Sequence, residues 1–338
     1  QRDFNDEYQS IRDLSNQNLS DRIIRERLLT KTAFEFSENA VRGALDVLNG
    51  AIQPIEPTAD PSDQIYLHNG IFYSFGVDAS GFFEPKGGDH AARAAYNQDL
   101  NAIKYWNTVD PKGIYTLLTT IVDYAGKRVV CQSPVPGLFT SAEPKEVKNE
   151  ETGEIELVDG DALTQVDYGY DDATNTIKSN PDFVKDMEPI RKALHYKKAK
   201  LENGEVVTNS EIKGMIGTDR RKYVIDLFST TPLDVEFKDE HFNLEKENSY
   251  PHGQVVTRLE AVQEWWAHEA KNMIKEEAEK KGIDLSTPLK EGEEAPSVTI
   301  DDDKLLFTPN GPETDANVRA LSKFIKSDLI PKFLEQYD

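Results

Sequence analysis

The dipeptide Asn69-Gly70 is the feature of this sequence that most restricts its fold. It separates two short runs rich in β-branched and aromatic residues within residues 64–75. Asn-Gly is the preferred pair for a two-residue hairpin turn, because both turn positions need a positive φ. The pattern therefore predicts an antiparallel hairpin over residues 64–75.

Two further hairpins are predicted from the same kind of pattern. Residues 113–132 carry β-forming side chains on both sides of Asp123-Tyr-Ala-Gly126, which predicts two strands joined by a short loop. The first of these strands is expected to be fully buried. Residues 211–228 predict a third hairpin around the turn Thr218-Asp-Arg-Arg221. The segment Ser133-Pro-Val-Pro-Gly137 ends the second hairpin, because proline has no N–H to donate to a sheet.

Apolar residues at helical spacing predict four helices, at 20–48, 181–198, 255–281 and 313–336. The first is expected to begin at the cap Ser20 and to end at Asn49-Gly50. Pro331 is expected to kink or interrupt the last. One apolar stripe of the first helix is expected to be buried, with Arg22, Arg25, Glu26 and Arg27 on its wet face; the stripe comprises Ile23, Ile24, Leu28, Phe34, Val41, Leu45 and Leu48.

Hairpins mixed with long helices, without repeated strand–helix–strand units, indicate an α+β fold rather than a doubly wound parallel sheet. At 338 residues the chain suits a single large domain, with a division into two lobes left open. The predicted parts are an N-terminal helical segment (1–60), an α+β core (61–260) and C-terminal helices (261–338). The acidic segment 141–161 is expected to be a surface loop or insertion, and the segment 286–304 is expected to be another acidic loop.

The charge of the chain is strongly negative, with 39 basic and 61 acidic residues and a net charge of −22. Such a charge weakens any general attraction to nucleic acid or to an anionic membrane. One region departs from it: between Lys185 and Lys222, ten Lys or Arg stand against six Asp or Glu. A local contact with RNA is therefore expected here rather than over the whole surface.

The candidate RNA-binding patch is taken from this region, with Tyr196 as a ring on which an unpaired base can stack. Arg191, His195 and Lys198 would share one side of the predicted helix. The same cations are also explained by a solvated helix end, where positive charge opposes the helix dipole. The residues of the patch are Arg191, Lys192, Lys197, Lys198, Lys200, Arg220, Arg221 and Lys222.

No catalytic, metal-binding or cofactor-binding residues are predicted. The six histidines are scattered, and none forms a His-Glu-x-x-His pair. Cys131 lies on a predicted strand, and no nearby basic partner is evident that would lower its pKa. We therefore interpret it as a buried structural cysteine. Asp226 at a strand end is compatible with a degenerate kinase-like nucleotide site, but the glycine-rich loop and the His-Arg-Asp loop are missing, so this alternative is less favoured.

The single cysteine excludes an intrachain disulfide, which fits a cytoplasmic protein. No run of about 18 apolar residues is present, and the start resembles neither a secretory signal nor a transit peptide, so no membrane insertion is expected. Because the chain begins with Gln1 rather than Met, we expect it to be a piece of a longer protein.

Several segments of the chain form a recognisable pattern when they are taken in order. They are Asn5-Asp-Glu-Tyr-Gln9, Arg22-Ile-Ile-Arg-Glu-Arg27 through Ala40-Val-Arg-Gly-Ala44, Val109-Asp-Pro-Lys-Gly-Ile-Tyr-Thr116, Val122-Asp-Tyr-Ala-Gly-Lys-Arg-Val129, Gln132-Ser-Pro-Val-Pro-Gly137, Gly214-Met-Ile-Gly-Thr-Asp219, Tyr223-Val-Ile-Asp-Leu227, Tyr250-Pro-His252 and Arg258-Leu-Glu260. These segments resemble the central (CLU) domain of the clustered mitochondria family, and the acidic insertions suggest a fungal member. The resemblance covers nearly the whole chain.

This resemblance implies a non-enzymatic module of a large cytoplasmic protein in which a helical region and tetratricopeptide repeats follow. It implies a role in mitochondrial distribution, through binding and translational control of mRNAs that encode mitochondrial proteins, and association with translation initiation factor three. The protein would then act near the mitochondrial outer surface or in ribonucleoprotein granules. The alternative is a structural or self-association domain, with RNA binding elsewhere in the longer protein.

Overall fold

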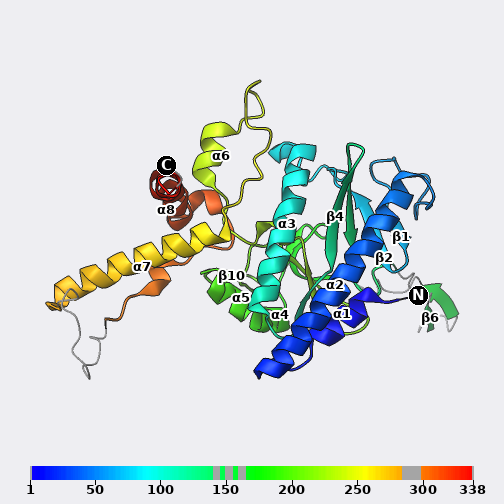
Figure 1. Ribbon diagram of the computed structural model, residues 1–338, viewed down its shortest axis with the longest axis horizontal. Coiled ribbons are helices and arrows are strands. Elements are labelled where there is room, and N and C mark those ends of the chain that lie inside the picture. Colours follow the sequence, from blue (N-terminus) through cyan, green and yellow to red (C-terminus); the bar gives the residue numbers. More distant parts are fainter. Residues whose placement is uncertain (1, 140–144, 149–154, 159–164, 284–297, 337–338) are drawn as a thin grey trace.

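The computed structural model describes residues 2–139, 145–148, 155–158, 165–283 and 298–336. It confirms the predicted α+β class: helices pack against a four-stranded and a five-stranded sheet, and the described residues also form two two-stranded sheets (Figure 1). No described helix combines the length and the apolar character that crossing a bilayer requires.

The first sheet, here called the N-terminal sheet, is antiparallel throughout and has the order β1-β2-β5-β4. Both predicted hairpins are present, and Asn69 and Gly70 have the expected positive φ values of 52° and 74°. A second two-residue turn, Ala125-Gly126, joins β4 to β5. The strands are β1 (Tyr66–His68), β2 (Ile71–Phe75), β4 (Thr119–Tyr124) and β5 (Lys127–Gln132).

The second sheet, here called the central sheet, is mixed and has the order β3-β13-β12-β8-β9. The third predicted hairpin forms its middle, as β12 and β13. At its edge β3 pairs in parallel with β13, although the two are far apart in sequence. The strands are β3 (Ile114–Thr116), β8 (Val166–Asp171), β9 (Thr176–Lys178), β12 (Lys213–Ile216) and β13 (Lys222–Ile225).

One strand prediction is wrong. The strand before Asp123 is not one buried unit, because the chain leaves the central sheet after Thr116 and enters the N-terminal sheet at Thr119, where only Val122 of β4 is buried. Within the acidic segment 141–161, the described parts β6 (Lys145–Lys148) and β7 (Ile155–Val158) pair with each other as a hairpin. A further small hairpin joins β10 (Ala199–Leu201) to β11 (Gly204–Val206).

Helix α2 (Leu19–Leu48) has the predicted extent, but its N-cap is Asn18 rather than Ser20, and its buried face differs from the predicted one. The helix packs on β4 and β5 through its small residues. A Cβ on Gly43 would lie only 2.0 Å from the hydroxyl oxygen of the buried Tyr73, so the helix approaches the sheet too closely for large side chains. The buried residues are Arg25, Thr32, Phe36, Ala40, Gly43, Ala44 and Val47.

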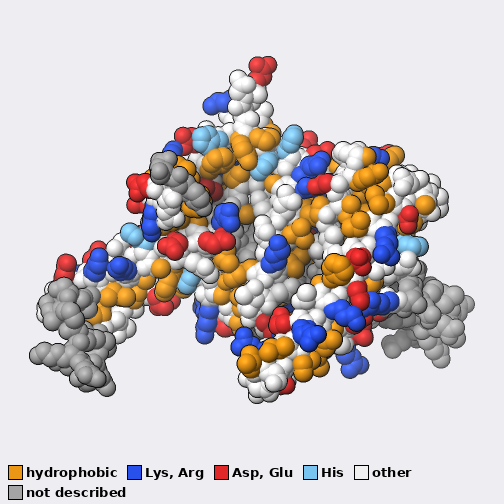
Figure 2. Space-filling view, viewed as in Figure 1, with side chains coloured by type: hydrophobic (Ala, Val, Ile, Leu, Met, Phe, Trp, Pro, Cys, Tyr) orange, Lys and Arg blue, Asp and Glu red, His pale blue; other side chains and the backbone are white. Residues whose placement is uncertain are grey.

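Several large apolar side chains of α2 point to solvent instead, although Phe36 is buried. Leu19, Ile23, Phe34 and Val41 lie 4, 11 and 7 residues apart, which places them on one side of the helix. They are 70%, 51%, 63% and 41% exposed. Figure 2 shows hydrophobic side chains gathered at the N-terminal end of this helix, at the lower centre.

Arg25, predicted to be solvated, is instead 5% exposed and forms a buried ion pair. Its guanidinium donates to both carboxylate oxygens of Asp110, at 3.0 and 2.9 Å, and to the carbonyl oxygen of Arg12. Arg12, at the end of α1 (Phe4–Arg12), also donates to Asp110, at 3.2 Å. One carboxylate thus ties α1 and α2 to the end of α3.

Helix α3 (Asp89–Val109) was not predicted from the sequence. Its buried residues are mostly alanine (Ala91, Ala92, Ala95 and Ala102), which give only a weak apolar pattern. Asp110 ends the helix in a left-handed conformation with φ 49°. This helix contacts β3 of the central sheet and the turn that follows β13.

The predicted helix 181–198 is two short helices, α4 (Pro181–Asp186) and α5 (Glu188–Ala193). Pro189 starts the second, because a proline fits the first turn of a helix but not its interior. The remaining helices are α6 (Val235–His241), α7 (Leu259–Lys281), α8 (Ala316–Phe324) and α9 (Ile330–Leu334).

Helix α7 begins later than predicted and ends at Gly282 as predicted. A π-helical turn, Ile325–Leu329, interrupts the last helix just before Pro331, which confirms the expected irregularity. The predicted acidic loop 286–304 lies partly outside the described residues, and its end forms a short helical turn, Asp302–Leu305.

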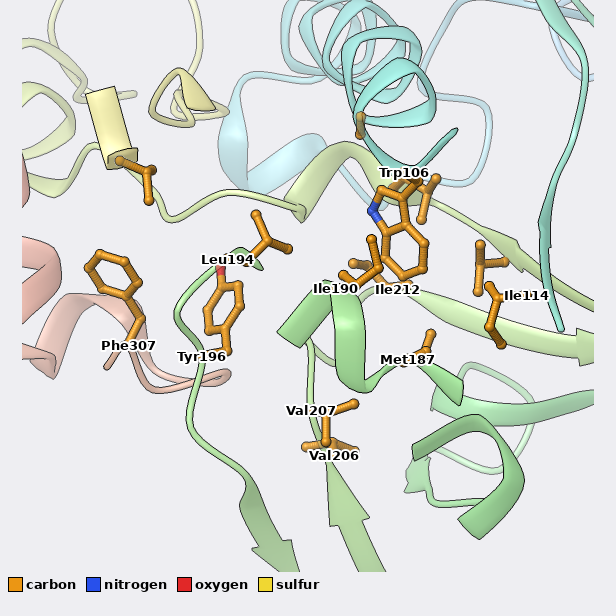
Figure 3. Close-up of a cluster of buried hydrophobic side chains, with 14 of the residues drawn as sticks. Trp106, Ile114, Met187, Ile190, Leu194, Tyr196, Val206, Val207, Ile212 and Phe307 are labelled. Carbon is orange, nitrogen blue, oxygen red and sulfur yellow. The ribbon is translucent and has the colours of Figure 1, made fainter. Parts of the chain in front are cut away.

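The larger core cluster joins the central sheet to α3, α5 and α7. Trp106 of α3 is fully buried, and Figure 3 shows its indole next to Ile190. Its Nε1 donates to the Thr230 hydroxyl at 3.0 Å. A second cluster fills the space between α1, α2 and the N-terminal sheet. Each sheet therefore has its own core.

Candidate functional site

The eight residues of the predicted basic patch are divided between two environments. Lys222 begins β13 and Arg221 directly precedes it, and both are already paired with acidic side chains. Arg221 donates to Asp6 of α1 at 2.8 Å and to Asp219 at 3.2 Å, and Lys222 pairs with Asp186 of α4. Arg220 is an exposed residue of the turn before them, with φ 67°.

The side chain of Arg191 also already forms hydrogen bonds within the protein. Its Nε and Nη2 donate to the two carboxylate oxygens of Glu188, and its Nη1 donates to the carbonyl oxygen of Tyr196. The Glu188 hydrogen bonds are the main cause of its raised pKa. This guanidinium fastens α5 to the chain that follows it.

Lysines of the same region remain at the surface, and we call them the lysine surface: Lys192, Lys197, Lys198 and Lys200. Lys198 lies 3.6 Å from Glu188. The side chains of Lys192, Lys197 and Lys200 form no ion pair within the part of the chain that the structure describes. A groove of about 520 Å³ adjoins this surface at Lys198, and Lys185, Glu188 and Glu205 also line it.

Two details of the sequence prediction are wrong here. Tyr196 cannot stack on a base, because it is 3% exposed and its ring packs against Phe307 in the core. Arg191, His195 and Lys198 do not share a helical face, because α5 ends at Ala193 and His195 has a left-handed backbone with φ 56°.

A separate cavity of about 720 Å³ is lined by residues of both sheets and of α3. Aromatic side chains form much of its wall. Phe82 and Phe83 meet edge to face at 4.9 Å, and Phe83 meets Phe228 at 5.5 Å. On another part of the wall Phe72 and Phe139 stack at 5.1 Å.

The polar part of this cavity, here called the acidic floor, comprises Asp99, Asp172, Glu211, Lys213 and Asp226. Lys213 of β12 lies between two of its carboxylates. Its Nζ is 2.8 Å from Asp172 and 3.0 Å from Asp226. Asp226 follows β13 directly in a left-handed conformation, φ 59° and ψ 44°. Desolvation raises the pKa of Asp226, and Lys213 opposes this rise.

Asp99 projects from α3 toward the same point. Its Oδ1 accepts the backbone N–H of Leu227 at 2.7 Å. Desolvation and the negative charge of Asp226 raise the pKa of Asp99 to about 7. A carboxyl with that pKa changes charge near neutral pH, which is typical of binding and catalytic sites.

Glu211 lies on the side of the acidic floor that is nearest to Lys86. Lys86 donates to Glu211 at 3.0 Å, and Ser229 donates to the second oxygen of the same carboxylate. The Lys86 ammonium also lies 5.3 Å from the ring centre of Phe82, a cation–π distance. A cation of the protein thus already uses both the acidic and the aromatic parts of this region.

Sequence reasoning noticed only Asp226 of this floor. Asp99 was missed because α3 was missed, and Lys213 because its partners lie on other elements. Among the described residues, no group of three His, Cys, Asp or Glu is arranged to hold a metal ion. Cys131 is fully buried, and desolvation raises its pKa to about 12, as expected of a structural cysteine.

Comparison with known proteins decides the family. The family model described as "Clustered mitochondria" matches residues 3–237. The chain belongs to the clustered mitochondria family. This confirms the resemblance found in the sequence, and it places both the lysine surface and the acidic floor inside the matched region.

Fungal relatives of the clustered mitochondria family support this assignment. A "Clustered mitochondria protein homolog" of Debaryomyces hansenii is 39% identical over 99% of this chain and 26% of its own length. The homolog of Candida albicans is 37% identical over 99% of this chain and 27% of its own length. That of Aspergillus oryzae is 40% identical over 83% of this chain and 21% of its own length.

The chain spans about a quarter of the length of these relatives. No solved structure matches it.

Proposed function

We propose that this chain is a non-enzymatic module of a longer cytoplasmic protein that serves the distribution of mitochondria. Membership of the clustered mitochondria family supports this role. We propose further that the module holds mRNAs of nuclear-encoded mitochondrial proteins and thereby takes part in their translation, next to the translation initiation machinery.

The observation that carries the RNA contact is the lysine surface. No Asp or Glu occurs between Pro189 and Leu201, whereas the whole chain has a net charge of −22. Four exposed ammonium groups beside a groove give phosphates a local positive surface. The paired cations Arg191, Arg221 and Lys222 contribute less, since each already has a carboxylate partner.

Reversing the charge of Lys192, Lys197, Lys198 and Lys200 to Glu is expected to reduce ultraviolet crosslinking to single-stranded RNA at least about tenfold. Removing each lysine–phosphate interaction should also lower the slope of log K against log salt by about 0.7, so the slope should fall by about 3 in total. Both quantities are measured by titrating labelled RNA at several salt concentrations.

The matched control reverses four exposed lysines on α7: Lys271, Lys275, Lys280 and Lys281. It changes the net charge by the same amount. If the control loses as much crosslinking as the first variant, bulk charge and not the lysine surface governs RNA binding. If neither variant loses crosslinking, the RNA contact lies elsewhere. Cells in which the longer protein carries the lysine variant should then show a normal distribution of mitochondria.

A second candidate, self-association, is favoured by the exposed apolar side of α2. Phe34→Asp with Ile23→Asp removes two large exposed side chains of that side without touching the buried face. The expected result is a shift from dimer to monomer in sedimentation velocity, with unchanged circular dichroism. A wild-type chain that sediments as a monomer at tens of micromolar would contradict this candidate.

A further inference from the structure

The cavity between the sheets combines three features that are not used by the proposed RNA contact. It is roughly of the size that encloses small organic ligands. Its wall carries aromatic rings, and its floor carries four carboxyl groups against one ammonium, that of Lys213. A ligand of this cavity must suit its size, its aromatic wall and its acidic floor.

The charge of the acidic floor argues against an anion. Lys213 is the cation of the floor, and its charge is already shared between Asp172 and Asp226. A phosphate placed here would face the carboxyl groups of Asp99 and Asp226, and like charges repel each other. Glu211 adds less to this repulsion, because it is already paired with Lys86. A cation placed at the same point would be attracted by Asp99 and Asp226.

Carboxylate oxygens of the acidic floor can also accept hydrogen bonds from a cationic ligand. Within the described residues, the hydrogen bond to Asp99 uses Oδ1, and the ion pair with Asp226 uses Oδ2. Asp99 Oδ2 and Asp226 Oδ1 therefore keep free lone pairs. The Asp226 side chain is 38% exposed, so a ligand can reach it from solvent.

The aromatic wall suits the rest of such a ligand. Ring faces attract cations and also pack against apolar groups. Phe82, which is 40% exposed, stands at an accessible part of the wall, and the ammonium of Lys86 already lies over its ring. The wall and the floor together match a molecule with a cationic end and an apolar body.

We propose that this cavity binds a small organic cation, whose ammonium or guanidinium group is held by Asp99 and Asp226 while its apolar body packs against the phenylalanines of the wall. The binding is separate from the RNA contact, because the lysine surface and its groove share no residue with this cavity.

The test uses a matched pair of probes, tryptamine and tryptophol, which share an indole ring and differ in an ammonium against a hydroxyl group. Isothermal titration is performed at pH 8, above the pKa of about 7 of the Asp99 carboxyl. Tryptamine is expected to bind at least about tenfold more tightly than tryptophol. Agmatine, which lacks the ring, tests the contribution of the aromatic wall and should bind more weakly than tryptamine.

Two substitutions locate the binding. Asp226→Asn should weaken tryptamine binding at least about tenfold, and asparagine tolerates the left-handed backbone of this position. Lys213→Gln should tighten tryptamine binding several-fold, because it frees Asp226 and Asp172 from their internal cation. Asp303→Asn, an exposed change outside the cavity, should leave binding unchanged.

Three outcomes would overturn the proposal. One is equal affinity of the two indoles, and another is the absence of heat from tryptamine at millimolar concentration. The third is loss of ligand binding on Lys213→Gln together with thermal stabilisation of the wild-type chain by magnesium and ATP. That result would assign the cavity to an anionic nucleotide, and it differs from the cation result in the sign of the Lys213 effect.

Discussion

Gly169→Ala is expected to prevent the chain from reaching its native fold, or to lower its free energy of unfolding by about 4 kcal/mol. Gly169 lies in the middle of β8 with φ 87°, a conformation that alanine adopts only with strain. A Cβ there would also lie 2.0 Å from the carbonyl oxygen of Ile212. Because that oxygen belongs to the backbone beside β12, it cannot rotate away.

Gly50→Ala is the matched control for this prediction. Gly50 has a similar φ of 73°, but nothing lies within 4 Å of its added Cβ. The substitution Gly50→Ala should lower the free energy of unfolding by about 1 kcal/mol, from backbone strain alone. Urea unfolding followed by circular dichroism measures both variants. Equal losses for the two would show that β8 can move away from β12, contrary to the close approach of the two segments.

Asp110→Asn is expected to lower the free energy of unfolding by about 3 kcal/mol at pH 7, since it leaves the buried guanidinium of Arg12 without a carboxylate and that of Arg25 with only the exposed Glu26. Arg12 and Arg25 have side chains only 4% and 5% exposed. Asparagine accepts the left-handed backbone of this position, so the change isolates the charge. Glu260→Gln, in the exposed pair with Arg258, should change stability by less than about 0.5 kcal/mol.

The effect of Asp110 also has a defined pH dependence. Desolvation acts to raise the pKa of this carboxyl, but Lys112, Arg12 and Arg25 outweigh it and hold the pKa below the ordinary value of 3.8. A group whose pKa is depressed in the folded state stabilises the fold above its unfolded pKa and loses that contribution as the pH falls. The difference between wild type and Asp110→Asn should therefore be constant above about pH 5 and shrink below about pH 4. A difference that grows on acidification would contradict this.

Features set by neighbouring residues were predictable from the sequence. The turn Asn69-Gly70 forms as expected because two residues determine its conformation locally. The end of α2 at Asn49-Gly50 and the end of α7 at Gly282 follow equally local rules. The α+β class followed from counting such local elements.

Features set by distant residues were not predictable in this way. The prediction of which side of α2 is buried was wrong, because the contact with Tyr73 requires a residue without a side chain at Gly43, and Ala40 lies against Cys131. Apolar periodicity does not reveal such a requirement. The acidic floor was missed for the same reason. Asp99, Lys213 and Asp226 come from three elements, and only the packing of α3 against the end of β13 brings them together.

The parallel pairing of β3 with β13 has a consequence for synthesis on the ribosome. All strands of the N-terminal sheet lie within residues 66–132, so that sheet can complete itself early. Ile225 at the end of β13 lies about 110 residues after Thr116 and, at about 5–20 residues per second, is translated roughly 5–20 s later. During that interval β3 has an open hydrogen-bonding edge, so the nascent chain needs protection from wrong partners until β13 leaves the ribosome.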